Sequence, residues 1–240
     1  MARRVVTPDA GAPSTTSEET NKTRRLLACG IVAGPLFLVV ALVQAFTRDG
    51  FDLRRHPISL LSLGELGWIQ IANFTVTGGL CVACAVGLRR VLRHGRGATW
   101  GPRLVGALGV GLIMGGVFLT DAGAGFPPGA PAGAPEETSW HGILHNLAPA
   151  LALDGMIVGC LVFARRFAAL RQRGWVAASV AAAVAVGVLT FWPDLDGISV
   201  RLVLASAIQF GFVAALAAHL VAGLPASTPA TARIQPTTSR

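Results

Sequence analysis

The chain has 240 residues, of which 52% are hydrophobic and 13% are charged, and its formal net charge is +8. A soluble globular chain carries about 25% charged residues, so this composition indicates an integral membrane protein. A positive charge also suits nucleic-acid binding, but the arginines flank apolar stretches and form no stripe with interleaved aromatics, so no nucleic-acid partner is expected. The sequence has no Gly-rich phosphate loop, nucleophile elbow or dinucleotide fingerprint, which disfavours nucleotide-dependent chemistry.

Six apolar stretches are long enough to cross a bilayer as helices. A spanning helix needs about 20 residues, with about 17 as the lower limit, because each residue rises about 1.5 Å through about 30 Å of hydrocarbon. The predicted spans are 26–46, 66–88, 104–120, 142–163, 175–192 and 202–220. The fold predicted is therefore an all-α integral membrane bundle of six transmembrane helices in a domain of residues 26–221. Segments 1–25 and 222–240 are predicted to be disordered and cytoplasmic, because they have too little periodic apolar content to pack.

The distribution of charge predicts the orientation of the spans. Sixteen of the twenty Lys and Arg residues lie in the terminal segments and alternate loops, and eight of the twelve acidic residues lie in the other loops. Short cytoplasmic loops carry the excess of Lys and Arg, so both termini are predicted to be cytoplasmic in a multi-pass protein of the cell membrane. All five tryptophans lie at or within four residues of a predicted helix end, as expected of rings that anchor in lipid headgroups.

A polar segment precedes the second span. Pro57 suits a first helical position and Gly64 a helix terminator, so a short interfacial helix is predicted between them. The polar candidates in and before this helix are Arg54, Arg55, His56, Ser59 and Ser62. The sequence places all of them on the outer side of the membrane.

Further polar residues lie at the outer ends of the second, third and fourth spans. Asp121 ends the third span, where desolvation raises a carboxyl pKa unless a cation pairs with it, so a partner is expected, with His141 and His145 of the fourth span as candidates. His141 and His145 are four residues apart, which places both imidazoles on one helix face, as two ligands of one metal require. Asn146 and Asn73 add polar groups at a similar depth. Together with the segment before the second span, these residues predict an outward-facing polar pocket.

Three interpretations of this pocket stay open at the level of sequence. The side chains could simply form hydrogen bonds to headgroups, water or loop carbonyls. They could bind a small molecule or lipid headgroup, with contacts from Arg54, Arg55, Ser62, Asn73 and Asn146. They could also form a zinc-dependent active site, because imidazole is a preferred zinc ligand and zinc lowers the pKa of a bound water to about 7.

Asp154 lies near the middle of the fourth span, away from this pocket. A charged side chain there costs about 2.5 to 3.5 kcal/mol on insertion scales, so Asp154 should face the bundle interior or be protonated. Its expected partners are Gln209, Ser206 and Cys84. A locally satisfied neutral acid is one interpretation, and a proton- or ion-coupled carrier that uses Asp154 is the other.

Three runs of sequence carry a resemblance to a known family. They are residues 54–74, which include the segment before the second span, residues 118–121 and residues 140–146. Together they resemble the bacterial membrane proteins grouped as domain of unknown function 998. The resemblance covers about residues 26–165, and it implies a compact multi-helix integral membrane protein whose biochemical activity is unassigned.

A more distant similarity gives the zinc hypothesis its content. Seven-helix metal-dependent membrane hydrolases, which include alkaline ceramidases and adiponectin-type receptors, use three His, one Asp and one Ser near one membrane face. The similarity implies that His56, His141 and His145 would hold zinc, that Asp121 would accept a proton, and that Ser59 or Ser62 would complete the site. The substrate would be a lipid amide or ester. This chain departs from the pattern, because it has six predicted spans and carries His-x-x-x-His in the fourth.

Overall fold

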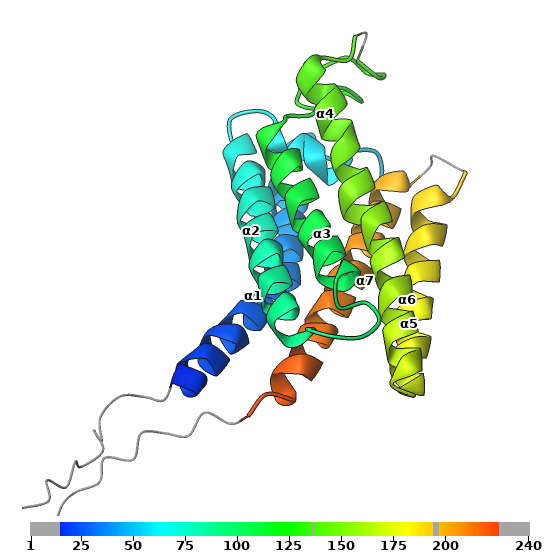
Figure 1. The fold of residues 1–240 in the computed structure, drawn as a ribbon. Helices are drawn as coiled ribbons and strands as arrows, with labels where there is room; N and C mark the ends of the chain where they lie inside the picture. The colour runs from blue at the N-terminus through cyan, green and yellow to red at the C-terminus, as the bar shows by residue number, and fades with distance from the viewer. Residues whose placement is uncertain (1–14, 136, 194–196, 226–240) are drawn as a thin grey trace, which may run out of the picture.

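The computed structural model describes residues 15–135, 137–193 and 197–225 (Figure 1). In chain order its elements are α1 (Thr15–Thr47), the 3₁₀ helix η1 (Ile58–Ser62), α2 (Gly67–Val91), α3 (Trp100–Val117), α4 (Trp140–Pro149), the π-helical turn η2 (Ala150–Asp154), α5 (Gly155–Ala169), α6 (Arg173–Phe191) and α7 (Ile198–Ala222). Because α4, η2 and α5 follow one another without a break, they make one span, Trp140–Ala169. Six helices in the described residues are long and apolar enough to cross a membrane, which confirms the predicted all-α architecture and the short helix before the second span.

The ends of the chain differ from the sequence prediction. α1 begins at Thr15, so residues 15–25 are helical where disorder was predicted. The physical reason is that this first part of α1 contacts other segments of the chain. Glu19 forms an ion pair with Arg90 at 3.3 Å, and Arg24 donates a hydrogen bond to the Pro225 carbonyl at 2.7 Å. That second contact also places the first residues of the predicted C-terminal tail. The rest of both predicted disordered segments, 1–14 and 226–240, lies outside the described residues.

The six spans pack as a closed ring. α2 lies between α1 and α3, α5 lies between α3 and α6, and α7 contacts both α6 and α1. The first and last helices are therefore neighbours, and the start of α1 and the end of α7, where the two termini leave the described structure, lie at the same end of the bundle (Figure 1). The loops that precede α2 and α4 lie at the opposite end, together with η1.

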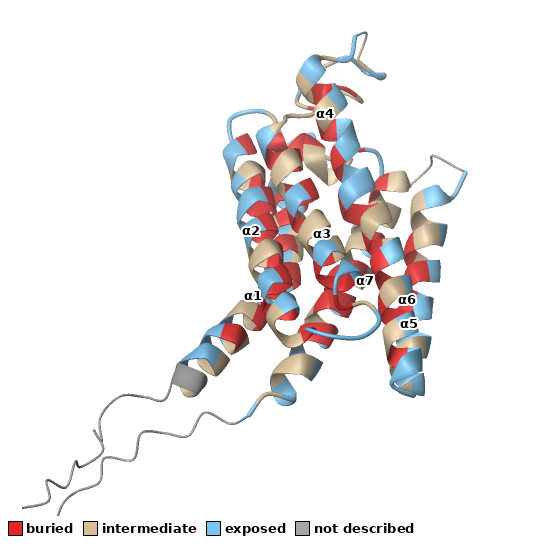
Figure 2. Ribbon diagram, viewed as in Figure 1, coloured by how far each residue is buried: buried red, intermediate tan, exposed pale blue. Residues whose placement is uncertain are grey.

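Buried residues lie on the helix faces that point into the ring, and exposed residues lie on the outward faces (Figure 2). Large side chains such as Phe37, Leu108, Phe163 and Met156 are 0–2% exposed in its interior. Many Val, Leu and Phe side chains on the outward helix faces are instead exposed, which is the pattern of helices whose surroundings are as apolar as their core.

α2 and α3 approach each other at two glycines. A Cβ added to Gly109 would lie 2.6 Å from the carbonyl oxygen of Gly78, and one added to Gly78 would lie 2.5 Å from the carbonyl oxygen of Gly109. The two backbones are thus in contact, which side chains of any size would prevent.

The fourth span is irregular near its middle. Pro149 has no backbone N–H and the following five residues form a π turn, so one turn of regular α-helical hydrogen bonding is lost there. In a membrane the freed groups need partners from the protein. Gln209 of α7 supplies one, since its Nε2 donates to the Leu153 carbonyl at 3.1 Å.

Candidate functional site

The end of the bundle opposite the termini is closed by a cluster that we call the aromatic cap, formed by Arg48, Phe51, His56 and Phe126. The ring of Phe126 is 5.2 Å from that of Phe51 and 5.6 Å from that of His56, and the guanidinium of Arg48 lies 5.5 Å from its centroid. Arg48 also donates to the carbonyls of Leu61 and Leu63. The aromatic cap therefore fixes η1 and ties the loop before α2 to the loop before α4.

Within the aromatic cap, His56 has both ring nitrogens engaged. Its Nδ1 accepts from the backbone N–H of Asp52 at 2.9 Å, so the proton of the neutral ring is on Nε2. Nε2 then donates to the Ala124 carbonyl at 3.0 Å. Neither nitrogen has a lone pair left for a metal, and the histidine instead links the loop before α2 to the loop before α4 through hydrogen bonds.

His141 belongs to a network at the start of α4. Ser139 is the N-cap of this helix, since its hydroxyl accepts from the Gly142 N–H at 3.1 Å. The same hydroxyl donates to the Asp121 carboxylate, which also accepts from the Ser139 backbone N–H. His141 Nδ1 lies 2.9 Å from the Leu119 carbonyl, which can only accept, so this nitrogen carries the proton.

The principal partner of Asp121 is therefore Ser139, and not the histidine expected from the sequence. The hydrogen bond from the Ser139 hydroxyl holds the pKa of Asp121 below its ordinary value, and this effect outweighs the desolvation that raises it. Sequence reasoning passed over Ser139, although a serine directly before an apolar helical run is an N-cap signal.

His145 is buried one turn further along α4. Its Nδ1 lies 2.8 Å from the Phe118 carbonyl, so this nitrogen is the donor and Nε2 is left as an acceptor in the neutral ring. Phe118 follows α3, where helix carbonyls lack partners within the helix. The four-residue spacing of His141 and His145 thus gives two donors that bind two successive carbonyls at the end of α3.

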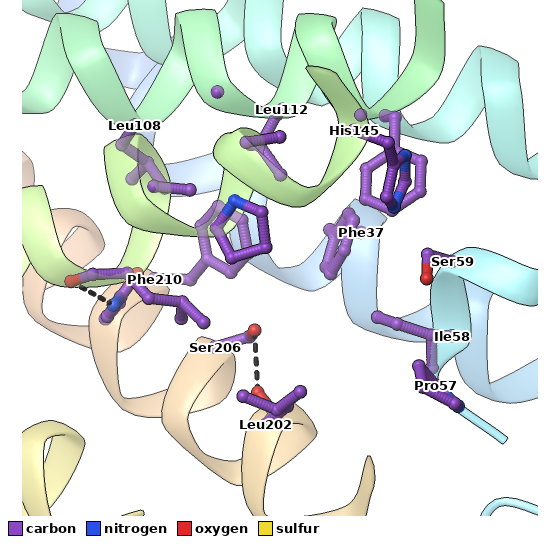
Figure 3. A pocket seen from close by; sticks show the side chains of 18 residues that line it. Phe37, Pro57, Ile58, Ser59, Leu108, Leu112, His145, Leu202, Ser206 and Phe210 are labelled. Carbon is purple, nitrogen blue, oxygen red and sulfur yellow. Dashed lines mark hydrogen bonds between the residues drawn. The ribbon is translucent and has the colours of Figure 1, made fainter. Parts of the chain in front are cut away.

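A cavity of about 120 Å³ extends from η1 toward the middle of the bundle, between α1, α3, the fourth span and α7 (Figure 3). Its residues are Phe37, Pro57, Ile58, Ser59, Phe74, Leu108, Gly111, Leu112, Gly115, His145, Ala148, Pro149, Ala152, Leu153, Leu202, Ser206, Gln209 and Phe210. Figure 3 shows Ser59 and His145 on the same side of it, and Leu108 on the other. The cavity is partly open to the surface and its walls are almost wholly apolar.

Two of its four polar residues are already paired. Ser206 donates to the Leu202 carbonyl at 2.8 Å, and Gln209 donates to Leu153. Ser59 has no side-chain hydrogen bond to any residue that the structure describes, and His145 keeps its acceptor nitrogen. Ser59 thus keeps both its donor and its acceptors for a ligand, whereas His145 and Ser206 keep acceptors only, and Gln209 keeps the acceptor oxygen of its amide.

The remaining predicted binding residues lie apart from the cavity. Arg54, Arg55 and Asn146 are exposed, whereas Ser62 and Asn73 are buried. The hydroxyl of Ser62 has no hydrogen-bond partner among the described residues.

Asn73 belongs instead to a buried amide network between α1 and α2. Its Nδ2 donates to the Phe37 carbonyl at 3.1 Å and lies 3.3 Å from Gln70 Oε1, which also accepts from Gln44 Nε2 at 2.8 Å. Gln44 and Gln70 were missed from the sequence, although a glutamine in an otherwise apolar span indicates an interhelical hydrogen bond.

The structure does not bring the predicted metal ligands together. No group of three or more His, Cys, Asp and Glu side chains within the described ranges is placed to hold a metal ion. The nitrogens of His56 are both used, and the carboxylate of Asp121 is committed to Ser139.

Asp154 ends the π turn in the fourth span and is half-buried. Of its three expected partners, Gln209 and Ser206 bond to backbone carbonyls, and Cys84 is buried against Gly30 of α1. Its carboxylate has no hydrogen bond or ion pair with any residue in the described part of the chain, so the partner expected from the sequence is not found there.

The fold and the composition of its surface define a multi-pass membrane protein with six spanning helices. The family described as "Protein of unknown function (DUF998)" matches residues 31–224. The chain belongs to this family, which confirms the resemblance seen in the sequence. Comparisons with curated proteins and with solved structures find no match.

Proposed function

We propose that this protein binds a neutral amphiphile, a lipid or small molecule with an apolar body and one hydrogen-bonding group, in the cavity below the aromatic cap. The observation that carries the proposal is that Ser59 and His145 offer unpaired hydrogen-bonding capacity on one side of a largely apolar space. Specific ligand sites combine apolar walls with a few placed polar groups in this way.

The composition of the lining favours a neutral ligand. Of the described residues around the cavity, none is Asp, Glu, Lys or Arg. A charged group buried there would lose its hydration without gaining a counter-ion, which costs several kcal/mol. A hydroxyl or amide, in contrast, can donate to His145 Nε2 and exchange a hydrogen bond with Ser59.

The size of the cavity limits what enters it. A cavity of about 150 Å³ accommodates benzene, so about 120 Å³ accommodates a short segment of an alkyl or isoprenoid chain. The rest of a longer ligand would extend through the open side of the cavity.

We infer further that the aromatic cap faces the outside and both termini face the cytoplasm, because the Lys- and Arg-rich loops lie at the end with the termini. Cysteine accessibility in intact cells tests this orientation, in a background where the four native cysteines are replaced by alanine. Arg54→Cys should react with a membrane-impermeant maleimide, and Arg93→Cys should not. The reverse pattern would refute the orientation.

The binding proposal is tested with a photoreactive long-chain alcohol on the full-length protein in detergent. Ser59→Ala and His145→Asn should each weaken labelling about fivefold, since each removes one hydrogen bond worth about 1 kcal/mol. Asparagine is chosen at 145 because its amide can still donate to the Phe118 carbonyl. Asn146→Ala is the matched control, since Asn146 is adjacent and exposed and does not line the cavity.

A second variant tests the cavity itself. A Cβ at Gly115 meets its nearest neighbours at 3.9 Å, so a larger side chain there starts without a clash and grows into the space. Gly115→Leu should abolish labelling by the alcohol. Undiminished labelling in Gly115→Leu, or labelling insensitive to both polar substitutions, would contradict the proposal.

A further inference from the structure

A second concave surface lies at the opposite end of the bundle, where the termini leave it. We call it the basic groove; it is lined by Arg96, Gly97, Trp100, Val162 and Arg165 and has a volume of about 520 Å³. It is formed by the loop that follows α2, the first residue of α3 and the last turns of α5. In Figure 1 this loop crosses the end of the bundle from α2 toward α5.

The loop is held in place by backbone contacts. Arg166 of α5 donates to the carbonyls of His94 at 3.1 Å and Arg96 at 3.0 Å, and Arg89 of α2 donates to that of Ala98. Gly97 has φ +75°, and a Cβ on it would lie 3.2 Å from Val162 Cγ1, so glycine is needed for this close approach. The position of Arg96 beside α5 is therefore fixed by the fold.

The charge of the basic groove is not compensated by the protein. Arg96 and Arg165 are exposed, and neither has a carboxylate partner among the described residues. A third cation, Arg103, lies 5.4 Å from the Trp100 ring, and the residue before α3 provides no side-chain cap for its first N–H groups. Arg96 and Arg103 lie at the N-terminal, positive end of the α3 dipole, and Arg165 adds a third guanidinium from the end of α5, so the electrostatics of the groove favour an anion.

The remaining lining residues indicate what kind of anion fits. Trp100 is exposed at the start of a spanning helix, where indole rings lie among lipid headgroups. Val162 belongs to the apolar part of α5, so the groove joins a cationic rim to a surface suited to hydrocarbon. We propose that the basic groove binds the phosphate of an anionic phospholipid, with Arg96 and Arg165 on the phosphate and Trp100 beside the glycerol.

Native mass spectrometry of the full-length protein in neutral detergent tests this site with phosphatidylglycerol as the probe. Arg96→Gln with Arg165→Gln should reduce affinity about 30-fold, because each arginine near a headgroup contributes about 1 kcal/mol. Both substitutions keep the loop, since Arg166 binds backbone carbonyls. Phosphatidylcholine should bind weakly to the native and doubly substituted proteins alike.

Lys22→Gln with Arg25→Gln is the matched control. These exposed residues lie on α1 at the same end of the bundle, and their loss changes the net charge equally. The control should keep the native affinity for phosphatidylglycerol. Equal losses in both double variants would overturn a defined site in favour of general surface charge. Displacement of the lipid by an equal concentration of inorganic phosphate would overturn the lipid assignment.

Discussion

The contact between α2 and α3 allows a stability prediction worked from distances. In Gly109→Ala the new Cβ would lie 2.6 Å from the Gly78 carbonyl oxygen and 2.9 Å from the backbone nitrogen of Val82, and ordinary contact begins at 3.4 Å. A third obstacle is the side-chain atom Val82 Cγ2 at 2.8 Å. Because the other two are backbone atoms, the helices must move apart by about 0.8 Å to relieve the closest contact. Overpacking of this kind costs about 1–3 kcal/mol.

Gly106→Ala is the matched substitution. It lies on the same helix, one turn earlier, and its new Cβ would meet Ala85 Cβ at 3.6 Å, which is an ordinary contact. Alanine is favoured over glycine in a helix by about 0.8–1.0 kcal/mol, and this gain is common to both variants. The difference between them therefore isolates the clash, and we expect Gly109→Ala to be less stable than Gly106→Ala by about 1–3 kcal/mol.

The assay is reversible unfolding in mixed detergent micelles, followed by circular dichroism as the fraction of sodium dodecyl sulfate increases. Both variants are compared with the native protein under one set of conditions. Equal unfolding midpoints for the two alanine variants would show that α2 and α3 do not meet at Gly78 and Gly109, and the reasoning would fail.

Three more predictions follow from single contacts. Because the pKa of Asp121 is lowered in the folded protein, its bond with Ser139 stabilises the fold above about pH 4, and this contribution is lost as the pH falls through the folded-state pKa. The thermal unfolding temperature should therefore change less between pH 6 and pH 3 in Asp121→Asn than in the native protein. Gln70→Leu should cost about 1 kcal/mol in the detergent unfolding assay, because it removes the acceptor shared by Gln44 and Asn73; an unchanged midpoint would refute a role for this network. Asp154→Asn should leave the unfolding midpoint unchanged or raise it, because the carboxylate has no partner among the described residues; a clear loss of stability would reveal one.

Much of the architecture follows from local sequence. The six spans could be predicted because length and hydropathy are properties of contiguous segments, and the bilayer requires backbone hydrogen bonds to close within each helix. Pro57 and Gly64 similarly located η1 from local backbone preferences. The extent of α1 was misjudged, since residues 15–25 depend on Arg90 and Pro225, which are distant in sequence.

The hydrogen-bond partners in the candidate site could not be predicted from local sequence patterns. The spacing of His141 and His145 placed both on one helix face correctly, but the pattern could not show that carbonyls after α3 would occupy their Nδ1 atoms. The sequence position of His56 likewise could not show whether it is free to bind a metal. Its Nδ1 accepts from the Asp52 backbone N–H, and its Nε2 donates to Ala124, which belongs to another loop.

Hydropathy alone thus determined that this protein crosses the membrane as six helices, and the arginine-rich segments indicated which loops share a side. Only the tertiary structure decided that Ser59 and His145 meet at one cavity and that Arg96 and Arg165 flank one groove. The physical reason is that the free energy of transferring a helix into lipid depends on the composition and length of that segment alone. A binding site, in contrast, depends on which helix faces meet, and that is settled by packing between residues far apart in the chain.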